Sequence, residues 1–461
     1  MNKTGIIGAG FSGIMTAVQL INKSTKPCEI LLIEKDKNIG GAAYNPYSDK
    51  HLLNVSTNKM SAFPDNPDHF LGWVMQQDEF IEKDKTLIAN AYLPRKLYGE
   101  YLKEIWKEAK KLAEEKAIKI SFINAAISEL DLIENSIALL LENGTKLIVD
   151  QCVIATGNHI PRNRKIENMD FYQSPNYFQN PWKRASVQNV NNDLPVLIIG
   201  NGLTMVDTVF GLLEQGFKGS IYSISPNGFN ILPHRHGGLQ YSKLVEELSD
   251  NMTLYDLTKL VIKHIKAVRE YGVSAEPVIN SLRPYTQKIW QSFSDREKEI
   301  FMARLRHLWG VARHRLPMHS HDKIQQLRID GKLHIHSGKI INIKETNKGI
   351  EVHYFNKKEN KQSSIMVSRV INCTGPNTDL TKQKDNFLKK CLQKGIVNQD
   401  GLKLGISANI KTFQILDTNG NIHSNLFTLG SNLSGELWES TAVNELRGQT
   451  EKLAGVLVNT F

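Results

Sequence analysis

Apolar residues form two short continuous runs that each end in a glycine turn. The first is "GIIGAGFSG" at residues 5–13, and the second is "VLIIGNGLTMVD" at residues 196–207. After each turn, apolar residues recur at the spacing of a helix. A continuous apolar run of this length is typical of a buried strand. Each segment therefore predicts a strand, a glycine turn and a helix, which is how a nucleotide-binding βα unit begins.

Two other stretches predict short strands of alternating polarity joined by turns. Residues 118–157 end in an apolar strand followed by Thr-Gly at Gly157, and residues 333–375 end in the same way at Gly375. One such Thr-Gly would be an ordinary junction between strand and turn, but both copies close a meander behind a glycine-loop unit. The repeated plan predicts an α/β fold with two Rossmann-like dinucleotide-binding domains, each with a β-meander, plus a helical insertion.

The first glycine loop has the residues that a dinucleotide requires. Gly8 permits the tight turn, Gly10 lets the backbone approach a pyrophosphate, and Gly13 lets helix and strand pack closely. The next apolar run ends at Glu34, where a carboxylate can bind both ribose hydroxyls. The alternative is a glycine turn that binds nothing, but strand, helix and acidic residue are all in place. The double glycine that ends at Gly41 is typical of FAD-binding proteins rather than simple NAD dehydrogenases.

The second glycine loop is less regular. Gly200 and Gly202 suit the turn and the pyrophosphate, and Thr204 could add a phosphate contact. The third small position is Met205, so helix and strand must lie farther apart or the side chain must point aside. We expect this loop to hold the nicotinamide cofactor that reduces FAD. The segment "GSIYSISPNGF" has neither the acidic residue expected for NAD nor an Arg for NADP, and Ser225 leaves NADH and NADPH both open.

Composition limits the classes of protein. The 461 residues are enough for two or three domains, and the formal net charge is +10. Lysines alternate with acidic residues in helices such as "EYLKEIWKEAKKLAEEKA", which favours solvated faces over a nucleic-acid site and leaves attraction of anionic ligands as the milder consequence. No apolar run approaches the roughly eighteen residues needed to span a bilayer. We expect a cytoplasmic protein without nucleic-acid or membrane partners.

The four cysteines are Cys28, Cys152, Cys373 and Cys391, and none belongs to a Cys-x-x-Cys pair. Their separation argues against a dithiol redox centre and against a structural zinc site. Buried packing is the expected role of each.

Four stretches together resemble one family: "HLLNVSTNKMSAFPDNPDHFLGWV", "LPRKLYGEYL", "LIIGNGLTMVD" and "LFTLGSNLSGELWESTAVNELRGQ". The chain is similar to FAD/NAD(P)-binding oxidoreductases, two-dinucleotide-domain flavoproteins that include flavin-dependent N-hydroxylating aspartate monooxygenases. The resemblance implies FAD-binding domain segments at 1–188 and 346–461. Between them it implies an NAD(P)-binding domain at 189–345, with the helical insertion at about 240–320.

The resemblance and the two loops together imply a set of cofactor-binding residues. They are Gly8, Gly10, Gly13, Glu34, Gly41, Met60, Arg95, Gly157, Gly200, Gly202, Thr204, Gly375, Gly430 and Trp438. Arg95 is expected near the flavin or its phosphates, and the segment from Gly430 to Thr441 over the isoalloxazine. Gly430-Ser431 stands where many flavoproteins have Gly-Asp against the ribityl chain. Met60 and Trp438 could form an apolar wall that excludes water from the flavin, although core packing is the more common role of such residues.

A basic cluster, "MARLRHLWGVARHRLPMHSH", predicts a helix that ends before Pro317. Arg313 and Arg315 are the candidates for clamping an anionic group of the substrate, since a guanidinium binds carboxylate or phosphate bidentately. The alternative is a solvated basic helix. His319 and His321 are two residues apart with no carboxylate motif, so no metal is expected.

These features predict an FAD-dependent NAD(P)H oxidoreductase. The resemblance implies a monooxygenase that uses molecular oxygen and a flavin hydroperoxide to hydroxylate a small anionic amine or amino acid, with no catalytic side chain identified. Two alternatives stay open. One is an NAD(P)H-dependent flavin reductase or dehydrogenase without oxygen insertion, and the other is a flavin-binding sensor without catalysis.

Overall fold

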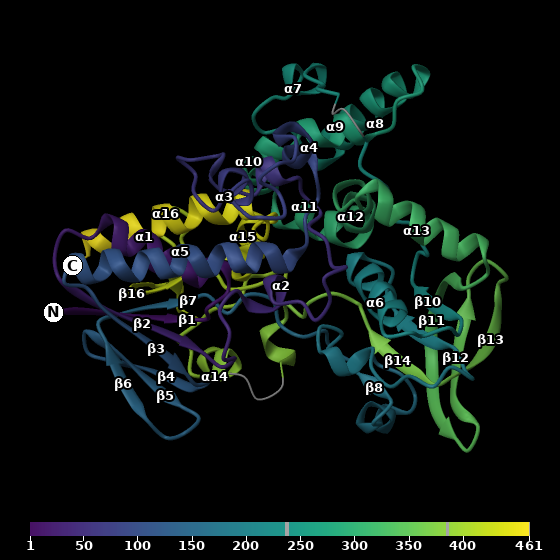
Figure 1. The fold of residues 1–461 in the computed structure, drawn as a ribbon, viewed down its shortest axis with the longest axis horizontal. Coiled ribbons are helices and arrows are strands. Elements are labelled where there is room, and N and C mark those ends of the chain that lie inside the picture. The colour runs from purple at the N-terminus through teal and green to yellow at the C-terminus, as the bar shows by residue number, and fades with distance from the viewer. Residues whose placement is uncertain (236–238, 384–386, 461) are drawn as a thin grey trace.

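A computed structural model describes residues 1–235, 239–383 and 387–460. Its strands form a 6-stranded, a 7-stranded and a 3-stranded sheet. The two larger sheets lie at opposite ends of the molecule, and most helices of the middle segment lie above and between them (Figure 1). Both termini lie at the end that holds the first sheet (Figure 1). The predicted fold, with two Rossmann-like units, two meanders and a helical insertion, is confirmed.

The first sheet has the strand order β15-β16-β7-β1-β2-β3. The strands are β1 (Asn2–Ile7), β2 (Cys28–Glu34), β3 (Lys119–Asn124), β7 (Gln151–Ile154), β15 (Gln414–Leu416) and β16 (Ile422–Thr428). β1 pairs in parallel with β2 and β7, so the first glycine loop leaves the sheet at its centre. Three helices pack together on one face: α1 (Phe11–Lys23), α5 (Arg95–Glu115) and α16 (Val443–Asn459).

The other face of the first sheet is covered by the first meander. Its strands are β4 (Ile127–Ile133), β5 (Ser136–Leu141) and β6 (Lys146–Val149), and α14 (Phe387–Gln393) packs against them. Apolar residues from both sides of β2 are buried, because helices cover one face and the meander the other. This two-sided burial explains why β1 and β2 read as continuous apolar runs.

The second sheet has the strand order β13-β12-β11-β10-β9-β14-β8. The strands are β8 (Tyr177–Phe178), β9 (Val196–Ile199), β10 (Ile221–Ser225), β11 (Leu333–Thr346), β12 (Gly349–Asn356), β13 (Lys361–Val367) and β14 (Arg369–Asn372). The first part of β11 pairs in parallel with β10, and the rest pairs antiparallel with β12. One long strand therefore belongs both to the parallel sheet and to the second meander.

This pairing locates the crossings between the domains. The expected boundary at residue 346 falls at the last residue of β11, which pairs with β12. β14 still pairs with β9, and the chain rejoins the first sheet only at β15. β8, which precedes residue 188, also pairs in the second sheet. The second sheet thus includes strands from outside the range 189–345 on both sides, because hydrogen bonding to distant strands decides membership in a sheet.

Helices supply the remaining layers. Between β10 and β11 lie α7 (Lys243–Glu246), α8 (Leu254–Glu270), α9 (Glu276–Ser281), α10 (Thr286–Ser292), α11 (Asp295–Ile300), α12 (Arg306–Arg313) and α13 (Met318–Ile329). The others are α2 (Gly41–Tyr44), α3 (His69–Val74), α4 (Lys85–Asn90), α6 (Leu203–Glu214) and α15 (Ser434–Leu437). In the inserted segment, Trp290 and Phe301 pack against Trp438 near α16. This contact brings the insertion over the C-terminal segment of the first domain.

Candidate functional site

The backbone of the first glycine loop leaves an open cradle. Gly8 has φ +108°, and a Cβ there would lie 2.4 Å from the Ala155 carbonyl oxygen. A Cβ at Gly13 would lie 1.8 Å from the Gly8 carbonyl oxygen. At Gly10, by contrast, the nearest neighbour of an added Cβ is Gly41 Cα at 4.0 Å. Gly8 and Gly13 are therefore required by packing, whereas Gly10 keeps open the space that a pyrophosphate needs.

The predicted ribose-binding carboxylate lies directly beside this cradle. The Ala9 amide donates to Glu34 Oε2 at 2.8 Å, and the Asp36 amide donates to Glu34 Oε1 at 3.1 Å. Gly40 N–H donates to the Ala9 carbonyl at 2.7 Å, which ties the double glycine to the loop. Each carboxylate oxygen keeps lone pairs for further hydrogen bonds. The residues present thus fit the ADP half of FAD.

The second glycine loop repeats the first in its packing. Gly200 has φ +109°, and a Cβ there would lie 2.4 Å from the Cys373 carbonyl oxygen, just as Gly8 faces Ala155. A Cβ at Gly202 would meet nothing within 4 Å, so this position is open to a ligand. Met205 is buried in the core of the second domain, so its side chain points away from the loop. Thr204 lies in the first turn of α6.

The two Thr-Gly returns lie behind the two loops. Gly157 and Gly375 have φ +66° and +88°, and an added Cβ at either would meet nothing within 4 Å. Thr156 lines the larger cavity described below. The Thr374 hydroxyl donates to Asn372 Oδ1 at 2.7 Å. After each meander, a glycine without a side chain thus lies at the edge of the sheet where the parallel strands end.

A cavity of about 1160 Å³ lies between the two glycine-loop units and draws residues from both. Its lining includes Gly8, Glu34 and Thr156 of the first domain and Ser225 of the second. The basic residues in the lining are Lys35, Arg162, Arg164, Lys165, Lys339 and Lys382, and the acidic ones are Glu34, Glu142 and Asp170. This excess of positive charge suits the phosphates of dinucleotides.

Two titratable groups show how enclosed this cavity is. Burial and the nearby Lys35 lower the pKa of His159 to about 4, so the imidazole is neutral at physiological pH. Burial and the neighbouring Arg162 also lower the pKa of Arg164. Positive groups are therefore held in a poorly solvated space, where an anionic ligand would be favoured.

The Gly430-Ser431 segment fits a flavin side chain. Gly430 has φ +73°, and its N–H donates to Gln449 Oε1 at 2.9 Å. The Ser440 hydroxyl donates to the Gly430 carbonyl at 2.7 Å. The Ser431 hydroxyl, in contrast, is buried and has no hydrogen-bond partner in the described parts of the chain. A buried hydroxyl costs free energy unless it is paired, so Ser431 suits contact with a ribityl hydroxyl.

The two apolar residues predicted near the flavin lie in packed clusters. Met60 is buried in the core of the first domain. The Trp438 ring stacks on Trp290 with centroids 5.1 Å apart, and Trp438 has the unusual φ of +56°. Strained backbone of this kind concentrates at functional sites. Contact of either side chain with a cofactor stays a prediction.

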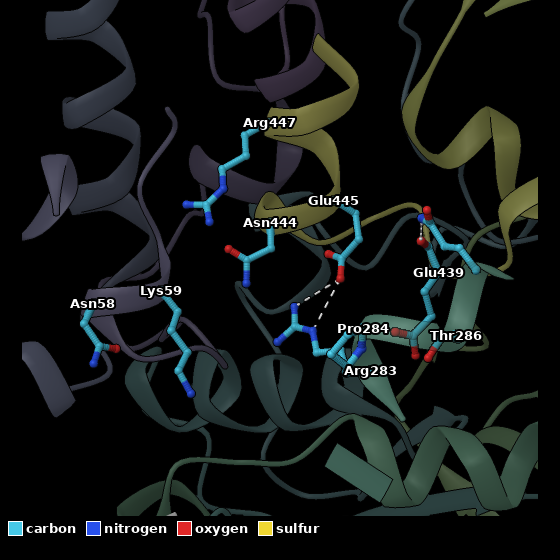
Figure 2. A pocket seen from close by; sticks show the side chains of 10 residues that line it. Asn58, Lys59, Arg283, Pro284, Thr286, Glu439, Asn444, Glu445 and Arg447 are labelled. Carbon is cyan, nitrogen blue, oxygen red and sulfur yellow. Dashed lines mark hydrogen bonds and ion pairs between the residues drawn. The ribbon is translucent and has the colours of Figure 1, made fainter. Parts of the chain in front are cut away.

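A smaller cavity of about 480 Å³ lies where the insertion meets the start of α16 (Figure 2). It is lined by Asn58, Lys59, Arg283, Pro284, Thr286, Gln287, Glu439, Asn444, Glu445 and Arg447. Arg283 Nη2 pairs with Glu445 Oε1 at 3.3 Å. Asn444 Oδ1 and Glu445 Oε2 are both buried without a hydrogen-bond partner among the residues described. The lining thus combines cations with two acceptor oxygens that are unused within the protein.

Sequence reasoning missed this cavity, because its residues come from three separated segments. Asn444, Glu445 and Arg447 project toward the cavity from the first turns of α16 (Figure 2).

The arginines predicted as substrate clamps each have a carboxylate partner in the protein. Arg313 Nε and Nη2 both donate to Glu439, at 2.9 Å to Oε1 and 2.9 Å to Oε2 respectively. Arg315 is 2% exposed and pairs with Glu276 at 2.6 Å. Arg313 therefore lies behind Glu439, which lines the smaller cavity. Neither arginine belongs to the lining of the two cavities described here.

Arg95 is also engaged within the protein. Its Nη2 pairs with Asp207 of α6 at 3.0 Å, and its Nε donates to the Leu52 carbonyl at 3.0 Å. It is not part of either cavity lining. Its contact with flavin phosphates remains a prediction, whereas its contact with the second domain is observed.

Two other features, a metal site and a membrane-spanning helix, are absent from the described ranges. In residues 1–235, 239–383 and 387–460, no group of three or more His, Cys, Asp and Glu side chains could hold a metal ion. Over the same residues, none of the helices is long and apolar enough to cross a membrane.

Comparison with known proteins agrees with this geometry. A family model described as FAD-NAD(P)-binding matches residues 5–159, from the first glycine loop to just beyond Gly157. A search of curated protein sequences finds no match. The matched range contains the first glycine-loop unit, and the second glycine loop lies outside it.

Solved structures match this fold from end to end. The ornithine N-hydroxylase of Kutzneria sp. 744 is 11% identical with a TM-score of 0.69, and 100% of this chain covers 99% of it. The ornithine hydroxylase of Pseudomonas aeruginosa is 12% identical with the same coverages and a TM-score of 0.67. The L-lysine 6-monooxygenase of Pseudomonas syringae is 13% identical with a TM-score of 0.67, and both chains are covered in full. At these identities the likeness establishes the fold.

Proposed function

We propose that this protein is an FAD- and NAD(P)H-dependent monooxygenase that hydroxylates the nitrogen of a small amine carrying an anionic group. The observation that carries the proposal is the pair of glycine cradles around one basic cavity, with a second, mixed-charge cavity beside α16. Full-length likeness to hydroxylases of ornithine and lysine supports the same reading.

In this proposal the protein positions and shields its cofactors. Bound FAD would accept a hydride from NAD(P)H and activate molecular oxygen. Gly10 and Gly202 would let the two pyrophosphates approach the helix N-termini, and Glu34 would hold a ribose. Ser431 would bind the ribityl chain. The packed cluster of Trp290, Phe301 and Trp438 would help keep water from the reacting atoms.

The smaller cavity is the proposed substrate site. Lys59 and Arg447 could bind an anionic group by charge-assisted hydrogen bonds. Glu445 Oε2 and Asn444 Oδ1 could accept hydrogen bonds from an ammonium, which would satisfy two buried oxygens. This arrangement replaces the predicted Arg313 and Arg315 clamp with residues that line the space itself.

The test begins with the flavin. After purification and identification of the bound flavin, NADH and NADPH oxidation is followed with a panel of amines and amino acids. Hydroxylated product is counted against hydrogen peroxide. We expect one class of amine to raise product above peroxide. Peroxide release with every candidate would contradict the monooxygenase.

An NAD(P)H-dependent reductase is the second candidate, because the bacillithiol disulfide reductase of Staphylococcus aureus shares the fold at 15% identity and a TM-score of 0.56. A dithiol mechanism has no support, since all four cysteines are buried and free. Burial raises the pKa of the Cys373 thiol to about 12, so it is a poor nucleophile. Electron transfer to an added acceptor without product would favour a reductase. Failure of both nicotinamides to reduce the flavin would favour a binding protein.

A further inference from the structure

One ion pair joins the second glycine-loop helix to the first domain. Arg95 is the first residue of α5, and Asp207 lies in α6. Arg95 Nη2 and Asp207 Oδ2 are 3.0 Å apart, and their side chains are 21% and 14% exposed. Both residues belong to stretches by which the sequence resembles flavoproteins, "LPRKLYGEYL" and "LIIGNGLTMVD". Dinucleotide-binding chemistry accounts for the glycines of the second stretch but leaves Asp207 without a role.

Further contacts reinforce this junction. His51 Nε2 lies 3.0 Å from the Asp207 carbonyl oxygen, and since a carbonyl only accepts, Nε2 carries the proton. Tyr47 packs on α6 so closely that a Cβ at Gly211 would lie 2.8 Å from its ring. His234 Nε2 lies 3.0 Å from the Asn54 carbonyl oxygen. The segment from Tyr47 to Asn54 thus contacts the second domain at several points.

The same segment leads to the proposed substrate cavity. Arg95 Nε donates to the Leu52 carbonyl at 3.0 Å, and Arg95 N–H donates to the His51 carbonyl at 2.9 Å. A few residues further along, Asn58 and Lys59 line the smaller cavity. At the other end of the ion pair, α6 begins directly after Gly202. The pair therefore connects the helix of the nicotinamide cradle to the loop beside the substrate cavity.

We propose that Arg95 and Asp207 are positioning residues that fix the orientation of the second dinucleotide domain relative to the first. This inference rests on the proposed function. In the step concerned, bound NAD(P)H would supply a hydride, with both electrons of its bond, to bound flavin, and a solvent proton would complete the reduced flavin. Arg95 and Asp207 would hold the two domains in the orientation that this transfer needs. Small misplacements of reacting atoms slow such steps strongly.

The test is anaerobic stopped-flow reduction of the bound flavin by NADPH and by NADH. We expect Asp207→Asn and Arg95→Gln to lower the limiting reduction rate about tenfold or more, because a misplacement of about 1 Å can cost about a hundredfold. The dissociation constant of the dinucleotide should stay within about twofold. The swapped variant Arg95→Asp with Asp207→Arg should recover part of the rate. Lys96→Ala is the matched control, since Lys96 pairs with exposed Asp49 at 3.2 Å.

A second readout does not depend on catalysis. Hydrogen exchange of the flavin-loaded protein should accelerate in α6 and in residues 44–54 of Asp207→Asn, but not of Lys96→Ala. Wild-type reduction rates with unchanged exchange in both charge variants would overturn the inference. If neither nicotinamide reduces the wild-type flavin, the proposed function fails, and the exchange experiment still decides whether the ion pair holds the domains together.

Discussion

At the scale of single residues, the glycine positions fall into two physical kinds. Gly8 and Gly200 have positive φ and face a carbonyl oxygen of the neighbouring strand, so packing within the protein requires glycine. Gly10 and Gly202 face open space, so packing within the protein does not require glycine there, whereas a bound dinucleotide would. The distinction separates effects on folding from effects on binding.

Gly8→Ala and Gly10→Ala test this distinction. Gly8→Ala should destabilise the protein by about 2 kcal/mol or more, because its Cβ would meet backbone atoms at a strained φ. Gly10→Ala should keep the melting temperature of the apoprotein but lose most of the flavin. Thermal unfolding and the ratio of flavin to protein measure both effects. Equal destabilisation by the two substitutions would contradict the assignment.

Ser431→Ala gives a second residue-scale prediction. The Ser431 hydroxyl has no partner in the described residues, so its loss should leave the stability of the apoprotein unchanged while weakening FAD binding about tenfold. Ser440→Ala is the matched control. Its hydroxyl donates to Gly430 and accepts from Gln449, so the control should lower stability by about 1 kcal/mol. Flavin titration of both apoproteins distinguishes the two serines.

At the scale of elements, the insertion is joined to the C-terminal segment by polar contacts as well as apolar packing. Glu439 accepts from Trp309 Nε1 at 3.0 Å and from Arg313. Gln287 Nε2 donates to the Glu439 carbonyl at 2.7 Å. Two helices of the insertion, α10 and α12, therefore converge on one residue beside the smaller cavity.

Glu439→Gln should loosen this junction. The substitution leaves the Arg313 guanidinium, whose side chain is 12% exposed, without a counter-charge, and loss of one partner of a buried pair costs about 3 kcal/mol. Paired removal in Arg313→Met with Glu439→Leu should cost less. Limited proteolysis within residues 240–320 and melting temperatures measure the effect. A single substitution no worse than the double one would contradict this account.

At the scale of the whole molecule, the net charge and the shared cavity would act on both proposed cofactors. The net charge is +10, and six basic side chains line the cavity between the domains. A poorly solvated basic cavity favours anions and disfavours further protonation. Ionic strength and pH are therefore the conditions expected to affect the molecule as a unit.

Salt should slow FAD association with the apoprotein. Raising ionic strength from about 0.05 M to about 0.5 M should lower the association rate several-fold, because screening weakens electrostatic steering. Lys339→Gln, in the cavity lining, should reduce the salt dependence, whereas Lys263→Gln, in an exposed pair with Glu247, should not. Stopped-flow flavin fluorescence gives the rates, and equal salt dependence in both variants would contradict the steering by the cavity.

Acidification should destabilise the apoprotein through His159. Its pKa is about 4 in the folded protein and about 6.5 when unfolded. Between these values the unfolded state binds more protons, so stability is present above pH 6.5 and is lost as the pH falls toward 4. From pH 7 to pH 5 the loss is about 2 kcal/mol. The melting temperature of His159→Gln should fall less over this pH range than that of the wild-type protein. An equal fall in both proteins would contradict the role of His159 in acid destabilisation.

The sequence by itself determined the local chemistry of this protein. Each glycine turn lies beside a buried strand and a helix in sequence, so short-range sterics and polarity were sufficient to predict both glycine-loop units and the α/β fold. The second loop also showed that Met205 departs from the pattern, but not that its side chain enters the core.

Only the tertiary structure decided which distant side chains meet. Arg313 and Arg315 were predicted from residue type alone, and the fold supplies each with a carboxylate, Glu439 and Glu276. Arg95 likewise meets Asp207, more than a hundred residues later in the chain. The lining of the smaller cavity comes from residues 58–59, 283–287 and 439–447, which no local pattern relates. Local geometry follows from neighbouring residues, whereas ion pairs and cavities depend on how whole elements pack, and for that reason they emerged only from the folded chain.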